Sequence, residues 1–306
     1  MVRPGVRGVA RRIVTAAVAG ARAAGPGELA AVLFVVPGVL VGAHLLPGSE
    51  AWAFSLANEG ILTSRWTLWT AFASSYVHSD VNHLLHNVGV YWMVVGVAYP
   101  LSAIVGWRAR FAGVTIACLV VIPVVSAWAT LATLGTITDV PSVGFSDVNT
   151  GLLGYLLVVW FVSADRATTG RIPRSLAFVA APASVAVVLA APSSVWYFPR
   201  YPIAAAAAAG VSLLVAAWIR WRKTQRASRN HTRRDGRGDS MGDRPDPADD
   251  RIDPVHEFVL VVGASVAVSG IVGSMLLVPA GANVWAHFAG YLAGLTAALP
   301  LVVLES

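Results

Sequence analysis

A serine and a histidine lie near the starts of two apolar segments that are far apart in the chain. Ser146 and His287 each precede about 20 mostly apolar residues. A serine hydroxyl becomes a nucleophile when a base removes its proton, and histidine is the usual base. The pair therefore predicts nucleophilic catalysis. The structural alternatives are a helix N-cap for Ser146 and a packing histidine for His287.

A second polar cluster, His78, His83 and Asn87, begins another apolar segment. A developing oxyanion needs preorganised hydrogen-bond donors. The imidazole of His83, the amide of Asn87 and the backbone N–H groups at the start of the Ser146 segment are candidates. His86 leaves a metal site with His78 and His83 as the alternative, but no acidic or thiol ligand accompanies them within the segment. We predict no metal ion and no cofactor.

The composition indicates a membrane protein. The chain has 306 residues, of which 56% are hydrophobic and 12% are charged, and its mean hydropathy is +0.67. A soluble domain carries about 25% charged residues. The apolar residues form blocks of about 20, the length that spans a bilayer, and backbone groups in lipid are satisfied by helices. We therefore predict an all-α membrane protein. Cys118, the single cysteine, cannot form an intrachain disulfide.

Eight apolar blocks predict eight membrane spans. They lie at about 29–46, 82–103, 111–134, 145–163, 173–191, 202–221, 257–279 and 284–303. If the N-terminus is cytoplasmic, 20 of the 22 Lys and Arg lie in inside segments, and only Arg65 and Arg200 lie outside. The positive-inside rule then predicts a multi-pass protein, in the cell membrane, with both termini cytoplasmic. This distribution accounts for the net charge of +6 without a nucleic-acid partner.

The segments between the spans differ in composition. Residues 1–28 are Arg-rich and predict a basic cytoplasmic tail against anionic lipid, with a signal or transit peptide as the alternative. Spans 1–6 occupy 29–221 and include an aromatic outer loop at 47–80. Residues 222–256 are charged and predict a disordered cytoplasmic loop, and 257–306 hold spans 7 and 8.

The predicted orientation places three polar helix starts at one depth. The spans that begin near His83, Ser146 and His287 all start on the outer side, slightly below the surface. Small residues that recur along the last two of these helices would let the backbones approach closely. These residues are Gly151, Gly154, Ala286, Gly290 and Gly294.

The three motifs, in this order, resemble the rhomboid family of intramembrane serine proteases. They are His78-(4 residues)-His83-(3 residues)-Asn87, then Gly144-x-Ser146 followed by two glycines, then Ala-His287-x-x-Gly-x-x-x-Gly. The resemblance covers roughly spans 1–4 and 7–8. It implies a rhomboid-like helical bundle with a six-helix core, to which spans 5 and 6 would add an extra pair.

The resemblance also implies roles for individual residues. Ser146 would be the nucleophile and His287 the general base, in a dyad without an acidic third member. His83, Asn87 and the Ser146 backbone N–H would form the oxyanion hole, and His78 would organise the outer loop. The supporting positions would be Gly144, Thr150 and Gly290. The implied partners are the lipid bilayer and transmembrane protein substrates, which would enter laterally and be cleaved near the outer face.

The chain departs from the family pattern at four places. Asp147 stands where glycine is usual, and it either opposes the oxyanion or faces water as a helix-start acid. Thr150 replaces an aromatic residue that stacks on the histidine, so His287 is held by a hydroxyl or held less firmly. Thr70 follows Trp69 where an arginine is usual. Three spans, rather than one, separate the serine and histidine helices, and we predict span 7 as the gating helix.

Three functions are compatible with this sequence. The first is an active intramembrane serine protease. The second is a catalytically silent rhomboid-like protein that binds membrane clients, although such proteins usually lack the serine or the histidine. The third is a transporter or channel, which would be expected to carry charged residues deep within its spans, where this chain has almost none. The protease is the prediction that the sequence favours.

Overall fold

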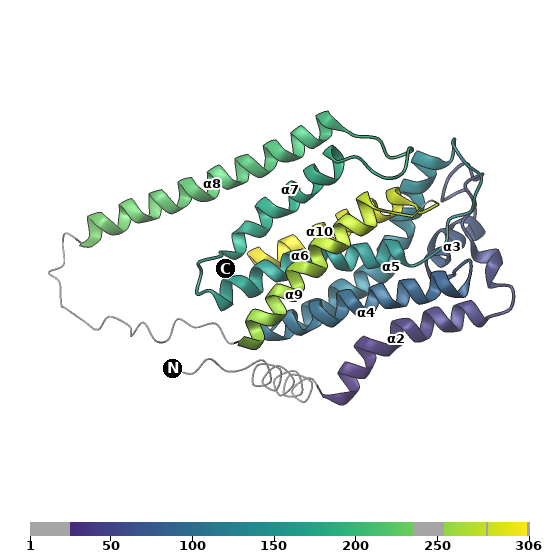
Figure 1. Ribbon diagram of the computed structural model, residues 1–306, viewed down its shortest axis with the longest axis horizontal. Helices are drawn as coiled ribbons and strands as arrows, with labels where there is room; N and C mark the ends of the chain where they lie inside the picture. Colours follow the sequence, from purple (N-terminus) through teal and green to yellow (C-terminus); the bar gives the residue numbers. More distant parts are fainter. Residues whose placement is uncertain (1–24, 235–253, 280, 305–306) are drawn as a thin grey trace.

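The chain folds into a bundle of helices (Figure 1). The computed structural model describes residues 25–234, 254–279 and 281–304. Within these ranges, seven helices are long and apolar enough to cross a membrane. They are α2 (Pro26–Leu45), α4 (Val81–Ile104), α5 (Arg108–Leu134), α6 (Ser146–Ala167), α8 (Pro202–Arg234, through Arg222), α9 (Pro254–Ile271, continued by the π-helical turn η5, Val272–Leu276) and α10 (Val284–Val303). The prediction of an all-α membrane protein is confirmed.

The predicted fifth span is shorter than a full membrane helix. It consists of η3 (Arg174–Leu176) and α7 (Ala177–Ala190), which together form an apolar helix from Arg174 to Ala190. Pro173 precedes this helix and Pro192 follows it closely, and proline restricts the residue before it to extended backbone. Its length of about 25 Å at 1.5 Å per residue falls short of the hydrocarbon core. Among the described residues, there are thus seven full-length candidate spans and one short apolar helix where eight spans were predicted.

Helix α6 lies at the centre of the bundle. Its apolar window is 83% buried, compared with 22% for α2 and 11% for α8, which lie at the periphery. Helices α4, α5, α9 and α10 all pack against α6. Helices α7 and α8 pack against each other and form a hairpin along one side of the bundle (Figure 1). The residue that begins the central helix is Ser146.

The backbones of α6 and α10 meet through their glycines. A Cβ atom added to Gly294 would lie 1.8 Å from the carbonyl oxygen of Gly151, and one added to Gly290 would lie 2.0 Å from that of Asp147. A Cβ on Gly154 would lie 2.6 Å from the carbonyl oxygen of Tyr291. Because nothing larger than hydrogen fits at these positions, the small residues determine how close the two helices come.

The inner segments differ in part from the prediction. Helix α8 continues to Arg234, so residues 222–234, predicted as disordered, are helical. This stretch holds Arg, Lys, Gln and Ala but neither glycine nor proline, which favours a helix. The rest of the predicted loop, 235–253, and the predicted tail up to residue 24 lie outside the described residues.

The outer loop contains three short helices and makes contact with the segment before Ser146. The helices are η1 (Ser49–Trp52), α3 (Arg65–Ala73) and η2 (Ser74–Tyr76). Phe54 and Ser142 exchange two backbone hydrogen bonds of 3.1 and 2.9 Å, and the amide of Gly144 donates to the carbonyl of Ser74 at 3.0 Å. These bonds hold the segment that precedes α6 against the outer loop.

Candidate active site

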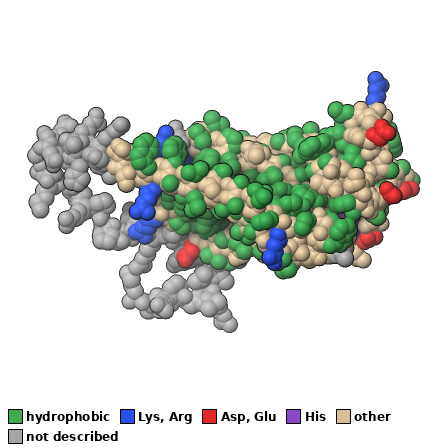
Figure 2. All heavy atoms as spheres, turned by 90° about the horizontal axis from the view of Figure 1, so that it is seen from above, with side chains coloured by type: hydrophobic (Ala, Val, Ile, Leu, Met, Phe, Trp, Pro, Cys, Tyr) green, Lys and Arg blue, Asp and Glu red, His purple; other side chains and the backbone are tan. Residues whose placement is uncertain are grey.

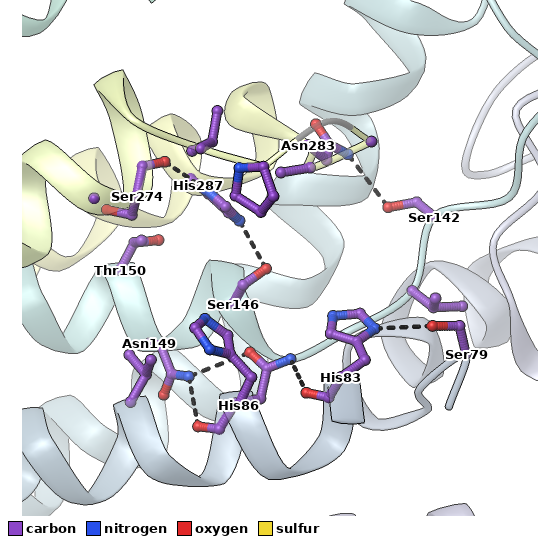
Figure 3. A pocket seen from close by; sticks show the side chains of 18 of the residues that line it. Ser79, His83, His86, Ser142, Ser146, Asn149, Thr150, Ser274, Asn283 and His287 are labelled. Carbon is purple, nitrogen blue, oxygen red and sulfur yellow. Dashed lines mark hydrogen bonds between the residues drawn. The ribbon is translucent and has the colours of Figure 1, made fainter. Parts of the chain in front are cut away.

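Ser146 and His287 lie within hydrogen-bonding distance of each other (Figure 3). The Oγ of Ser146, on the first residue of α6, is 2.8 Å from the Nε2 of His287, in the first turns of α10. His287 is buried, and Ser146 is half-buried at the edge of a cavity. The close packing of α6 on α10 thus brings together two residues that are 141 positions apart.

The other ring nitrogen of His287 contacts the end of the helix before it. Nδ1 lies 2.7 Å from the carbonyl oxygen of Ser274, in the π-helical turn η5. A carbonyl can only accept, so Nδ1 carries a proton and the Nε2 of the neutral ring is free to accept from Ser146. Of the two alternatives for Thr150, a hydroxyl bond to His287 is not the one found, because both ring nitrogens of His287 have other partners and Thr150 Oγ1 donates to the carbonyl of Asp147 at 2.7 Å.

The Ser274 carbonyl is available because the helix ends there. Ser274 is among the last four residues of η5, whose carbonyls have no N–H partner further along the helix. In a π-helix the carbonyl of Ser274 would accept from the N–H of residue 279, but residue 279 is a proline and has no N–H. The sequence contains no signal for this contact, because the group that orients His287 is a backbone carbonyl and every residue has one.

Asn283 holds the start of α10 against two other segments. Its Oδ1 accepts from the amide of Ala286 at 3.0 Å, which caps the helix. Its Nδ2 donates to Thr130 of α5 at 2.7 Å and to Ser142 at 3.3 Å (Figure 3). Asparagine is a preferred N-cap residue, so the sequence carried a local signal for the cap but none for the tertiary bonds.

Gly144 lies where the chain passes under the ring of His83. Its φ is +112°, a conformation that residues with a side chain rarely adopt. A Cβ at this position would lie 2.6 Å from His83 Nε2 and 3.6 Å from Asn87 Nδ2. Glycine at position 144 thus has two physical reasons, its backbone conformation and its contact with the His83 ring, and its supporting role in the site stays a prediction.

His83 is linked to a carboxylate through a hydroxyl. Ser79 donates its single hydroxyl proton to Asp80 at 2.9 Å, and its oxygen lies 3.2 Å from Nδ1 of His83. Nδ1–H must then be the donor, and Nε2 of the neutral ring is an acceptor. The amide of His83 and the hydroxyl of Ser79 both donate to Asp80, which lowers the pKa of this carboxyl and keeps it ionised. Donation from Nε2 to an oxyanion therefore requires the protonated ring.

Asn87 is fully buried and keeps one amide proton for the cavity. One Nδ2 proton goes to the carbonyl of His83 at 3.1 Å, which leaves the second for another acceptor. Asn149 of α6 donates to the Asn87 carbonyl at 3.0 Å and ties α4 to α6. Both asparagines line the cavity beside Ser146.

His78 lies just before α4 and packs edge-on against His83, with ring centroids 5.1 Å apart. Burial, together with the nearby His83, lowers the pKa of His78 to about 4. His78 is therefore neutral at physiological pH. Its ring contacts that of His83, and the role expected for it in organising the outer loop stays a prediction.

Asp147 is buried and does not line the cavity, so the interpretation in which it faces water is wrong. Its effect on an oxyanion stays a prediction. Asp147 is 3% exposed, and one carboxylate oxygen accepts from the hydroxyls of Ser75, at 2.7 Å, and Ser126. The other oxygen accepts from the amide of Val148 at 2.7 Å. The carboxylate thus joins η2, α5 and the first turn of α6, where the helix dipole favours a negative charge.

Asp147→Ala is expected to destabilise the protein rather than accelerate it. The change removes the acceptor of the Ser75 hydroxyl and of the Val148 amide, and leaves the Ser126 hydroxyl only the Pro123 carbonyl, which costs about 3–5 kcal/mol for a buried charged network. Thermal unfolding in detergent should show a clearly lowered midpoint. A variant that unfolds like the wild type but turns over substrate faster would contradict this role.

A cavity of about 1120 Å³ connects these residues. It is lined by Ser146, His287, Asn87 and His86, and it extends along apolar side chains such as Met93 of α4 and Leu277, which directly follows η5. Its lining is mostly apolar, with the polar groups gathered near Ser146 (Figure 3). Such a cavity fits an apolar chain that presents one polar bond to the serine.

The residues that the structure describes contain no group of three or more His, Cys, Asp or Glu side chains placed to hold a metal ion.

A family model described as the rhomboid domain matches residues 65–223, about half of the chain. No curated protein and no solved structure matches the chain.

Proposed function

Because the chain belongs to the rhomboid family, we propose that it is an intramembrane serine endopeptidase that cleaves transmembrane segments near the outer face of the membrane. One observation carries the proposal. The 2.8 Å contact between Ser146 and His287 is made by a ring whose other nitrogen is already engaged by a carbonyl. A histidine that only packs, or a serine that only caps a helix, does not require a hydrogen bond between the two side chains with the second ring nitrogen also bonded.

The proposed reaction begins when Ser146 Oγ attacks a substrate peptide carbonyl and gives its proton to Nε2 of His287. The ring becomes an imidazolium, and its Nδ1–H bond to the Ser274 carbonyl partly offsets the new charge. The same Nε2–H then protonates the leaving amine, which yields an acyl-enzyme. Water hydrolyses this ester, with His287 again taking and returning one proton.

The proposed oxyanion donors are the backbone N–H of Ser146, at the start of α6, and the Nδ2–H of Asn87 that is not bonded to His83. The first-turn amides lack intrahelical carbonyl partners and lie at the positive end of the helix dipole. His83 becomes a third donor only when its ring is protonated, because its Nδ1–H is directed at Ser79.

Asn87→Ala is expected to reduce kcat by about 10²–10³, the usual cost of losing one oxyanion donor. The measurement is cleavage of a model transmembrane substrate by purified protein in liposomes. Asn58→Ala is the matched control, because Asn58 also donates one amide proton to a backbone carbonyl, at 2.8 Å, but lies in the outer loop. Equal rates for wild type and Asn87→Ala would remove Asn87 from the oxyanion hole.

Substrate access is proposed to run between α4 and α9, because residues of both helices line the cavity down from Ser146. Helix α9 packs on α4 and α6, and it directly precedes the histidine helix. These contacts support α9, the predicted span 7, as the gating helix. A transmembrane segment that entered here would reach Ser146 from the side.

The chain is a multi-pass integral membrane protein. Its proposed orientation places the end with α3 and Ser146 outside. Figure 2 supports this orientation, because acidic side chains gather at the end where α3 lies and basic side chains lie largely toward the other end. A cytoplasmic N-terminus then follows from the positive-inside rule.

Cleavage of a model transmembrane substrate by the reconstituted wild type tests the proposal directly. Binding of that substrate without any cleavage would instead identify a silent family member.

A further inference from the structure

The loop of the α7–α8 hairpin, residues 191–201, is bonded to the end of the helix that orients His287. The amide of Ser194 donates to the carbonyl of Leu276 at 2.9 Å, and its hydroxyl donates to that of Val278 at 2.7 Å. Ser193 adds a longer bond of 3.4 Å to Met275. These acceptors all lie within four residues of Ser274, and the last carbonyls of a helix otherwise have no partner.

The same hairpin packs against α10 on either side of His287. Phe198 is buried. The centroid of its ring lies 4.7 Å from the ring centroid of Trp285 and 6.0 Å from that of Phe288. One turn further along α10, the Tyr291 hydroxyl lies 2.7 Å from the Ser184 hydroxyl of α7. The hairpin therefore contacts both the residues just after Ser274 and the helix α10 that carries His287.

We infer that the α7–α8 hairpin, the pair of helices additional to the predicted six-helix core, is a positioning clamp for the base of the proposed protease. It holds the η5 carbonyls with Ser193 and Ser194 and holds the His287 helix with Phe198. Ser194 is the positioning residue, because it supplies two bonds, one to Leu276 at the end of η5 and one to Val278 just after it. The inference rests on the proposed function, since a clamp on His287 matters for turnover only if His287 is the base.

The physical need for a clamp follows from the groups involved. A carboxylate would hold an imidazole strongly, but the group here is a neutral carbonyl at the end of a helix. Helix ends fray, and a small displacement of a reacting group lowers the rate steeply. Fixing the neighbouring carbonyls at 275, 276 and 278 restricts the motion of Ser274 and keeps His287 Nε2 aimed at Ser146.

Ser194→Ala is expected to lower kcat about fivefold with KM unchanged, the usual effect of one net hydrogen bond, and Ser193→Ala/Ser194→Ala should lower it further. Ser194→Thr should restore the rate, because the exposed Ser194 side chain leaves room for a methyl group. Ser212→Ala is the matched control. Its hydroxyl makes a 2.8 Å bond to the Val179 carbonyl within the same hairpin but does not contact α9.

A second measurement does not depend on proteolysis. In protein labelled with ¹⁵N-histidine, the Nδ1–H of His287 should give a slowly exchanging proton signal that is absent from His287→Ala. Exchange of this proton with water should be about fivefold faster in Ser194→Ala, and unchanged in Ser194→Thr and Ser212→Ala.

The outcomes separate the two proposals. A wild type that neither cleaves substrate nor reacts at Ser146 refutes the protease, and the histidine signal then still decides whether the clamp exists. An active wild type with Ser194→Ala unchanged in both kcat and proton exchange overturns the clamp. The clamp is also overturned if Ser212→Ala shows the same losses or if threonine fails to restore them.

Discussion

Ser146→Ala and His287→Ala are each expected to lose about 10⁴-fold or more of the proteolytic rate. The two side chains share one proton along the 2.8 Å contact, so removing either one removes the proton transfer as a whole. For the same reason the double variant should be no slower than the single ones. The measurements are substrate cleavage and covalent labelling by a fluorophosphonate probe, which reacts with an activated serine hydroxyl.

The chain contains a matched control on the same helix. Ser163, also on α6, lies 2.7 Å from Nε2 of His256 and is fully buried. It does not line the cavity that contains Ser146. Ser163→Ala should therefore label at the wild-type rate. Labelling that persists in Ser146→Ala, or that is lost equally in Ser163→Ala, would refute the assignment of Ser146 as nucleophile.

Gly294→Ala is expected to destabilise the bundle by about 3 kcal/mol or more and to abolish probe labelling. The added Cβ would lie 1.8 Å from the Gly151 carbonyl oxygen, and backbone of a central helix cannot move aside as a flexible side chain can. Helix α10 must then shift away from α6, which separates His287 from Ser146.

Gly96→Ala provides the comparison. Gly96 lies in α4, and a Cβ there would meet no atom within 4 Å. This variant should be as stable as the wild type or slightly more so, since alanine favours a helix. The measurements are thermal unfolding in detergent and the probe-labelling rate. A Gly294→Ala protein with wild-type stability and labelling would mean that the close approach of α6 and α10 is not required.

Local patterns predicted the membrane class and most of the elements. Hydrophobic blocks and their charge flanks determine whether a segment enters a bilayer, and this is a property of the segment itself. The span predicted at 173–191 corresponds to the apolar helix Arg174–Ala190, which is short because Pro173 and Pro192 bound it. The sequence did not predict the extension of α8 to Arg234, because the charged composition of 222–256 was interpreted as a disordered loop. Residues 222–234 nevertheless include several good helix formers, such as Arg, Lys, Gln and Ala.

The sequence by itself determined the candidate site residues, because Ser146, His287 and Asn87 have polar side chains near helix starts of one predicted depth. Only the tertiary structure decided how they are held. The Ser274 carbonyl, the buried bonds of Asp147 and the contacts of Ser194 all join segments distant in sequence. Backbone carbonyls are common to every residue, so their use at a site depends on where helices end and which neighbours pack against them.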